Sequence, residues 1–135
     1  MIQKTLNIIK PDAVSRNLIG EIIKIFENKD LSVKALQMKK LSVNEAEKFY
    51  EEHRGKPFYG SLVSYMTSGP VVVIVLEGDN AVERVRSIMG ATNPANAAEG
   101  TIRKLYAESI ERNSVHGSDS QTSAHREVSF FFPNL

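Results

Sequence analysis

The 135-residue sequence predicts an α+β fold in which four strands form an antiparallel sheet and the helices pack mainly on one of its faces. Three observations lead to this prediction. An alternating segment at 4–9, rich in Ile, Leu and Thr, indicates a strand, and six consecutive apolar residues at 71–76 indicate another. Apolar residues between 19 and 26 recur with the period of a helix. The elements follow a βαββαβ order, with extra helices and an irregular loop.

The first predicted strand ends before Pro11, because proline cannot donate a hydrogen bond to a strand ladder. Lys10 therefore lies at a strand end. A helix follows and runs to about Lys29. Its apolar stripe is formed by residues spaced at i, i+3, i+4 and i+7, namely Ile19, Ile22, Ile23 and Phe26.

Residues 32–40 form the second predicted strand. Ser42 and Glu45 have the spacing of a capping box, which begins a helix that presents Phe49 and Tyr50 on one face. Another short helix follows and ends at Ser68, where Gly and Pro come next.

The apolar run at 71–76 lies between Pro70 and Gly78 and consists mostly of β-branched residues. A strand without polar positions is typical of one covered on both faces, so we expect it in the centre of the sheet. Asp79 is the expected cap of the next helix, which ends at Gly90.

The last third of the chain is less regular. Residues 91–100 predict a loop, and residues 113–120 are small and polar. Val128, Phe130 and Phe132 alternate with other residues, and this pattern predicts the last strand.

Composition limits the classes of protein that the chain can belong to. With 41% apolar and 24% charged residues, we expect one domain over residues 1–135 rather than a disordered chain. The formal net charge of +1 gives no general attraction to nucleic acid, and the absence of cysteine excludes disulfides and thiolate chemistry. No apolar run is long enough to span a membrane or to direct export.

The common phosphate-binding and zinc-protease motifs are absent, so any nucleotide chemistry must use other residues. The segment N-S-V-H-G-S-D-S at 113–120 is distinctive, because it surrounds His116 with small polar residues and places Gly117 beside it. Glycine would allow a ligand to approach the backbone closely.

Four motifs in the same order resemble the nucleoside diphosphate kinase family, in its short bacterial form. They are N-I-I-K-P-D-A-V at 7–14, S-G-P-V-V at 68–72, G-A-T-N-P-A at 90–95 and the histidine segment at 113–120. The resemblance covers nearly the whole chain. It implies a ferredoxin-like fold, and ping-pong transfer of the γ-phosphoryl group from a nucleoside triphosphate, typically ATP, to a nucleoside diphosphate of almost any base.

The resemblance assigns catalytic roles to five residues. His116 is the nucleophile that forms a phosphohistidine, and imidazole suits this role because about half or more of it is neutral at pH 7. Glu127 is expected to orient its ring. Ser118 is a supporting hydrogen-bond partner, although a plain turn serine fits equally well. Tyr50 reaches toward the phosphoryl group, while packing of its ring is equally expected. Lys10 lies within reach of the reacting phosphate.

The same resemblance implies a set of phosphate and ribose contacts. Arg86 and Arg103 offer planar pairs of donors to phosphate oxygens, and Thr92 adds a hydroxyl. Lys10 and Asn113 are expected near the ribose 3′ hydroxyl. A solvated surface is the ordinary position of a single Lys or Arg, so the argument depends on the match to the motifs.

The base is expected to stack on Phe58, with Leu62 and Ile110 as apolar neighbours. Ordinary core packing is the alternative explanation for Phe58 and Leu62. Stacking on an aromatic ring discriminates poorly between bases. His53 and His125 match no family site and are interpreted as surface histidines.

The remaining expectations concern partners. The sequence contains no Asp/Glu cluster for a metal, so Mg²⁺ is expected to arrive bound to the nucleotide phosphates. The family resemblance implies a homo-oligomer, a tetramer or hexamer built on a dimer, and a cytoplasmic location. No membrane or nucleic-acid partner is expected.

Two other classes of function compete with the enzyme. Ferredoxin-like domains also bind RNA or sense small ligands, but the aromatic RNP pattern of RNA-recognition domains is absent. An inactive relative that serves as an oligomeric scaffold is harder to distinguish, although each chemical position keeps the expected residue type.

Overall fold

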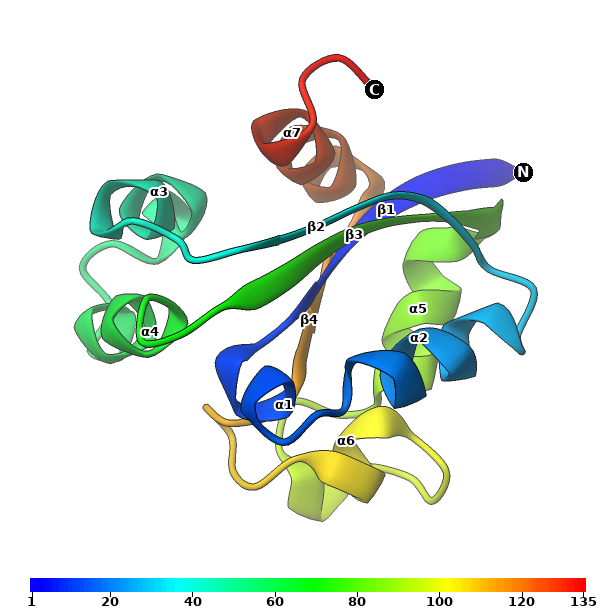
Figure 1. Ribbon diagram of the computed structural model, residues 1–135, viewed down its shortest axis with the longest axis horizontal. Coiled ribbons are helices and arrows are strands. Elements are labelled where there is room, and N and C mark those ends of the chain that lie inside the picture. Colours follow the sequence, from blue (N-terminus) through cyan, green and yellow to red (C-terminus); the bar gives the residue numbers. More distant parts are fainter.

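One antiparallel sheet organises the computed structural model, which describes residues 1–135 (Figure 1). Its strands are β1 (Ile2–Ile9), β2 (Ser32–Lys39), β3 (Val71–Asp79) and β4 (Val115–Gly117). They lie side by side in the order β2-β3-β1-β4, and each neighbouring pair is antiparallel. The predicted four-stranded antiparallel sheet is confirmed.

Helices cover both faces of this sheet. Figure 1 shows α7 on one side of the strands and α2, α5 and α6 on the other. The first apolar core lies under α1 (Pro11–Ser15), α2 (Ile19–Glu27), α5 (Ala81–Met89) and α6 (Ile102–Tyr106), and the second under α3 (Val43–Phe49), α4 (Tyr59–Met66) and α7 (Gln121–Phe131). The predicted packing of helices on one face of the sheet is found for α2 and α5, which are the two helices of the βαββαβ order. The additional helices α3, α4 and α7 cover the second face. Two 3₁₀ turns complete the chain, at Glu51–His53 and Pro94–Asn96.

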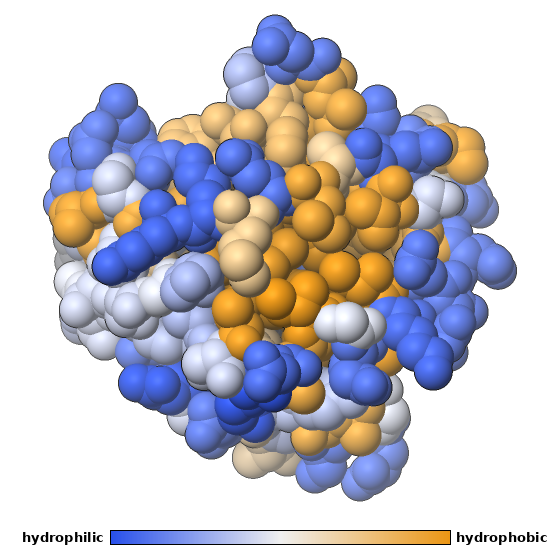
Figure 2. Space-filling model, viewed as in Figure 1, coloured by the Kyte–Doolittle hydropathy of each residue, from blue (hydrophilic) through white to orange (hydrophobic).

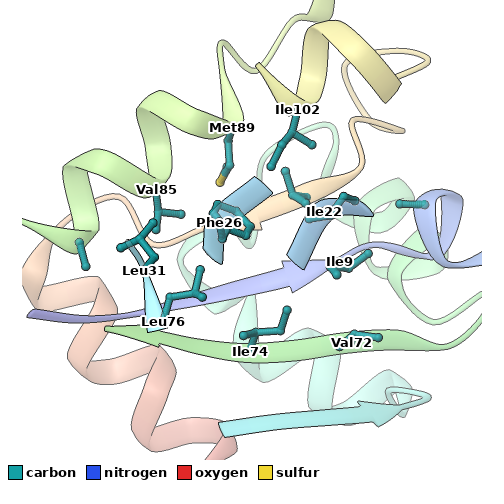
Figure 3. Packing of buried hydrophobic residues seen from close by; sticks show 13 residues of the cluster. Ile9, Ile22, Phe26, Leu31, Val72, Ile74, Leu76, Val85, Met89 and Ile102 are labelled. Atoms are coloured by element: carbon teal, nitrogen blue, oxygen red, sulfur yellow. The ribbon is translucent and has the colours of Figure 1, made fainter. Parts of the chain in front are cut away.

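The central position of β3 explains its unbroken apolar sequence. Alternate side chains of a strand point to opposite faces, so Val72, Ile74 and Leu76 enter the first core and the residues between them enter the second. Figure 3 shows the first core, where Phe26 lies among side chains from the sheet, α2 and α5. The prediction that this strand is covered on both faces is confirmed.

The prediction of a last strand at 128–132 is wrong. Residues 128–131 belong to the C-terminal part of α7, and Phe132 follows it. The fourth strand is β4, whose three residues pair with β1 so that His116 lies opposite Ile8. Alternation over five residues fits a helix as well, because Ala124, Val128 and Phe131 have helical spacing. Ser120 caps this helix by accepting a hydrogen bond from the Ser123 N–H.

Most of the predicted helix ends are confirmed. Ser42 and Glu45 form both bonds of the capping box, and Gly90 ends α5 with a φ of +91°. Asp79 does not cap α5. It pairs instead with the N-terminal amino group, and Asn80, in the left-handed region, precedes the helix.

Candidate active site

A cleft of about 530 Å³ collects the predicted site residues from distant parts of the chain. Every one of them except Ser118 lines it: Lys10, Tyr50, Phe58, Leu62, Arg86, Thr92, Arg103, Ile110, Asn113, His116 and Glu127. A second cleft of about 740 Å³ shares Arg86 with it but contains neither His116 nor Lys10. The smaller cleft is therefore the candidate active site.

His116 lies in the middle of β4, so the sheet fixes its backbone. Its Nε2 lies 2.8 Å from Oε1 of Glu127, which α7 carries across the sheet. Glu127 is only 3% exposed and accepts a hydrogen bond from this nitrogen in its ionised form. The contact defines the tautomer, because a proton on Nε2 leaves Nδ1 with a lone pair.

Ser118 supports Glu127 rather than the histidine. Its hydroxyl donates to Oε1 of Glu127 at 2.9 Å and accepts from the Leu6 N–H at 3.3 Å. Arg126 lies 3.5 Å from the other carboxylate oxygen. The buried carboxylate thus has partners on both oxygens, which keeps it in place beside the ring.

Tyr50 closes the cleft on the side of α3. Its ring is buried in the second core, with its centre 6.3 Å from that of His116, and its hydroxyl has no hydrogen-bond partner. Burial, reinforced by the charge of Glu127, raises the pKa of Tyr50, so the hydroxyl stays a donor. A buried hydroxyl without a partner at the wall of a cleft is available to a ligand.

Lys10 and Asn113 form a buried pair next to this wall. Lys10 is 7% exposed, and its Nζ donates to Oδ1 of Asn113 at 2.8 Å. Burial and the charge of Arg103 lower the pKa of Lys10 to about 8. The amide of Asn113 in turn donates to the Thr92 carbonyl at 3.2 Å, which links the pair to the loop after α5.

The two arginines reach the cleft from different helices. Arg103 of α6 is buried, and its two Nη atoms donate to the carbonyls of Gly90 and Val115, both at 2.9 Å. Arg86 of α5 is exposed and donates to the Gly117 carbonyl at 3.2 Å. Burial, and secondly the charge of Arg86, lower the pKa of Arg103 to about 10.

The mouth of the cleft is apolar. Phe58 and Ile110 are exposed and lie outside the core, whereas Leu62 is half-buried and packs against the second core. Thr92 is also exposed at the cleft. An aromatic ring open to solvent beside aliphatic groups can stack with a flat ligand.

Some residues of the cleft were not predicted. Glu52, His53, Glu111 and Asp119 also line it. His53, interpreted as a surface residue, is partly exposed, but its ring also lines the cleft, with its centre 5.4 Å from that of Phe58. A 3₁₀ turn places it there, and no spacing in the sequence indicated this. His125 is exposed outside the cleft.

Gly117 lines the cleft and also has a packing role. A Cβ atom at this position would lie 2.5 Å from Sδ of Met89 and 3.4 Å from the Val85 side chain. Glycine therefore lets α5 pack directly on β4, which brings Arg86 to the strand that carries His116.

The structure contains no group of three or more His, Cys, Asp or Glu side chains placed to bind a metal ion. Its helices are also all too short or too polar to cross a bilayer.

The cleft brings a histidine, a lysine and two arginines together on an α+β fold, and comparisons with known proteins identify the class of the protein as a phosphotransferase. The family model described as nucleoside diphosphate kinase matches residues 3–135. The chain belongs to the nucleoside diphosphate kinase family.

Individual relatives agree along the whole chain. It is 58% identical to the nucleoside diphosphate kinases of Haemophilus ducreyi, over 98% of this chain and 96% of the relative, and of Nitratidesulfovibrio vulgaris strain DP4, over 100% and 97%. The crystal structure of the Aquifex aeolicus nucleoside diphosphate kinase superposes with a TM-score of 0.96 at 40% identity, covering 98% of this chain and 96% of that one.

Proposed function

We propose that this protein transfers the γ-phosphoryl group of a nucleoside triphosphate to a nucleoside diphosphate by a ping-pong reaction, with His116 as the covalent carrier. The observation that carries this proposal is the contact between Nε2 of His116 and Glu127, which leaves Nδ1 as the nucleophilic nitrogen. The cationic side chains of Lys10, Arg86 and Arg103 line the cleft beside this ring and suit a substrate that carries several negative charges.

The first half-reaction forms a bond between Nδ1 of His116 and the γ-phosphorus, and breaks the bond from that phosphorus to the β–γ bridging oxygen. The electron pair leaves with the nucleoside diphosphate, and the positive charge on the ring is stabilised by Glu127. The second half-reaction is the reverse, with a different diphosphate as acceptor. No proton needs to leave the histidine in either step, so the cleft requires fixed charges rather than a general base.

The other cleft residues position and neutralise the substrate. Arg86, Arg103 and Thr92 bind the phosphates. The two arginines donate to the carbonyls on either side of His116, Gly117 and Val115, and Thr92 lines the same cleft. Lys10 and Asn113 bind the ribose and the reacting phosphate. Each Nη atom of Arg103 uses one hydrogen to bind a carbonyl, which leaves its second hydrogen available for a phosphate oxygen.

The base stacks on Phe58 between Leu62 and Ile110. The exposure of this ring at the mouth of the cleft supports the assignment. Since every base presents an aromatic face, this platform accepts all common bases. Tyr50 donates its free hydroxyl to the transferred phosphoryl group, and its lack of a partner supports this role.

Mg²⁺ enters the cleft as part of the nucleotide complex. The carboxylates of Glu52, Glu111 and Asp119 line the cleft without forming a metal-binding group of their own. This arrangement suits a cation that keeps its water and binds through substrate phosphates, where it neutralises phosphate charge.

We also propose a cytoplasmic homo-oligomer, a tetramer or hexamer built on a dimer. What supports assembly is the free edge of β2, where Leu36 is 49% and Met38 is 53% exposed. Figure 2 shows apolar surface gathered on the face that β2 presents. Light scattering that gives the mass of a single chain at micromolar concentration would contradict the oligomer.

Two half-reactions test the proposed function. Protein incubated with Mg-ATP labelled on the γ-phosphate is expected to become labelled, with a bond that is labile to acid and stable to base. Unlabelled GDP or dTDP should then discharge the label as the corresponding triphosphate. His116→Ala should abolish labelling, and His125→Ala, at an exposed position outside the cleft, is the matched control. A wild-type protein that binds nucleotide without becoming labelled would instead support an inactive scaffold.

A further inference from the structure

Asp12 is a buried carboxylate that none of these steps uses. It follows Lys10 and Pro11 in the first motif of the chain and is 3% exposed. An acidic residue in the first turn of a helix is common, because it complements the helix dipole. The side chain of Asp12, however, makes its hydrogen bonds to other parts of the chain, and α1 has only five residues.

Three segments meet at this carboxylate. Its Oδ1 accepts a hydrogen bond from the Tyr65 hydroxyl of α4, and that hydroxyl accepts one from the Asp12 N–H at 2.9 Å. Its Oδ2 accepts from the Ser114 hydroxyl at 3.4 Å and lies 3.6 Å from Arg16. A buried carboxylate with partners on both oxygens restrains all the groups that bind it.

Ser114 connects Asp12 to the candidate active site. Its φ is +73°, a left-handed conformation that serine adopts only where the surroundings impose it. Its carbonyl accepts the Lys10 N–H at 2.9 Å. Asn113, the partner of Lys10 Nζ, precedes it, and β4 with His116 begins at the residue after it.

We propose that Asp12 is a positioning residue, whose carboxylate fixes the left-handed turn at Ser114 and thereby sets Lys10 and Asn113 beside His116, while its charge compensates the buried ammonium of Lys10. The inference deepens the proposed function and rests on it for the role of Lys10. Asp12 contacts neither substrate nor reacting atoms in this account.

The charges around Lys10 determine in which direction loss of the Asp12 carboxylate shifts the pKa of Lys10. Burial and Arg103 of α6 lower its pKa to about 8, whereas Asp12 and Glu111, in the loop before β4, raise it. Arg16 and Arg112, the second of these lying over the ring of Tyr65, face the carboxylate network rather than Lys10. Loss of the Asp12 charge therefore lowers the pKa of Lys10 further, so that its ammonium is lost at lower pH.

The first test compares Asp12→Asn with Tyr65→Phe. The alkaline limb of kcat/KM should move to lower pH by roughly one unit in Asp12→Asn, which removes the charge and keeps the shape. It should stay within about 0.3 units of wild type in Tyr65→Phe, which removes a hydrogen bond and keeps the charge. Equal losses of activity with unchanged profiles would mean that Asp12 is merely structural and would overturn the proposal.

The second test concerns the turn and does not require Asp12→Asn to fold. Ser114→Gly adopts a positive φ without the hydroxyl, and Ser114→Ala loses the hydroxyl and keeps the strain. Both variants should lose kcat/KM because both lack the hydroxyl that binds Asp12, and the alanine variant should lose about tenfold more because it keeps the strained φ, since a misplaced reacting group costs up to about 100-fold. Wild-type kcat/KM in both variants would contradict the positioning role.

A third readout separates this inference from the proposed function. The Lys10 side chain can be titrated by NMR in lysine-labelled protein, with Lys10→Arg used for assignment. A lower midpoint in Asp12→Asn than in wild type supports the inference even if no phosphoryl transfer occurs, and an unchanged midpoint rejects it even in an active enzyme.

Discussion

The ionisation of Lys10 links the proposed chemistry to pH. Its pKa is lowered to about 8 in the free protein, and only the protonated ammonium neutralises phosphate. We therefore expect kcat/KM to fall as pH rises through about 8. Bound phosphates favour the ammonium, so the corresponding limb of kcat should lie at higher pH. Steady-state rates between pH 6 and 10 measure both limbs, and a kcat/KM that stays flat to pH 10 would show that Lys10 is not required as a cation.

Glu127 controls the tautomer of His116. In Glu127→Gln the amide can donate to Nε2, which moves the ring proton to Nδ1 and blocks the attacking lone pair. We expect kcat to fall by roughly 10² to 10⁴-fold with a smaller change in KM, as for other histidines whose orienting carboxylate is neutralised. Glu83→Gln, at an exposed position of α5, is the control. A variant that keeps full kcat would disprove the orienting role.

The sequence predicted which residues meet at the cleft, but it did not predict their hydrogen bonds. Motifs preserve residue types in order, so His116 and Arg103 could be named from them. Hydrogen bonds depend on the rotation of side chains packed between elements distant in sequence. For this reason Ser118 was expected as a supporting hydrogen-bond partner without its bond to Glu127 being specified, and the bonds from Arg103 to two carbonyls were not foreseen.

At the scale of helices and strands, long hydrophobic patterns predicted the element type correctly, whereas short patterns did not. The six apolar residues of β3 identified a central strand because only burial on both faces explains them. The three residues of β4 are too few to show a period, and the alternation at 128–132 fits both a strand and α7. Pairing with β1 makes Val115–Gly117 a strand, which is a tertiary effect.

The capping box of α3 gives a prediction at this scale. Ser42→Ala removes the acceptor for the Glu45 N–H and should lower the free energy of unfolding by about 1 kcal/mol. The box lies outside the cleft, so kcat should not change. Urea denaturation measures the stability, and Ser129→Ala, at an exposed position of α7, should differ from wild type by less than about 0.5 kcal/mol. Equal stability of the two variants would mean that the cap contributes nothing.

At the scale of the whole molecule, β1 and β3 contribute to both apolar cores, which therefore depend on the same sheet. The single domain over residues 1–135 remains a prediction, and it implies one cooperative transition. Calorimetry is expected to show a single transition with a calorimetric enthalpy equal to the van't Hoff enthalpy per cooperative unit. Two transitions that persist at all protein concentrations would indicate that the two cores unfold separately.

The whole reaction depends on one nitrogen of the molecule that carries the phosphoryl group between two nucleotides. NMR of the phosphorylated protein, labelled with ¹⁵N in histidine and observed through ³¹P, identifies this nitrogen directly. We expect one phosphate per chain, bonded to Nδ1 of His116, because Glu127 binds Nε2. A phosphate on Nε2, on another histidine or on Ser118 would contradict the account.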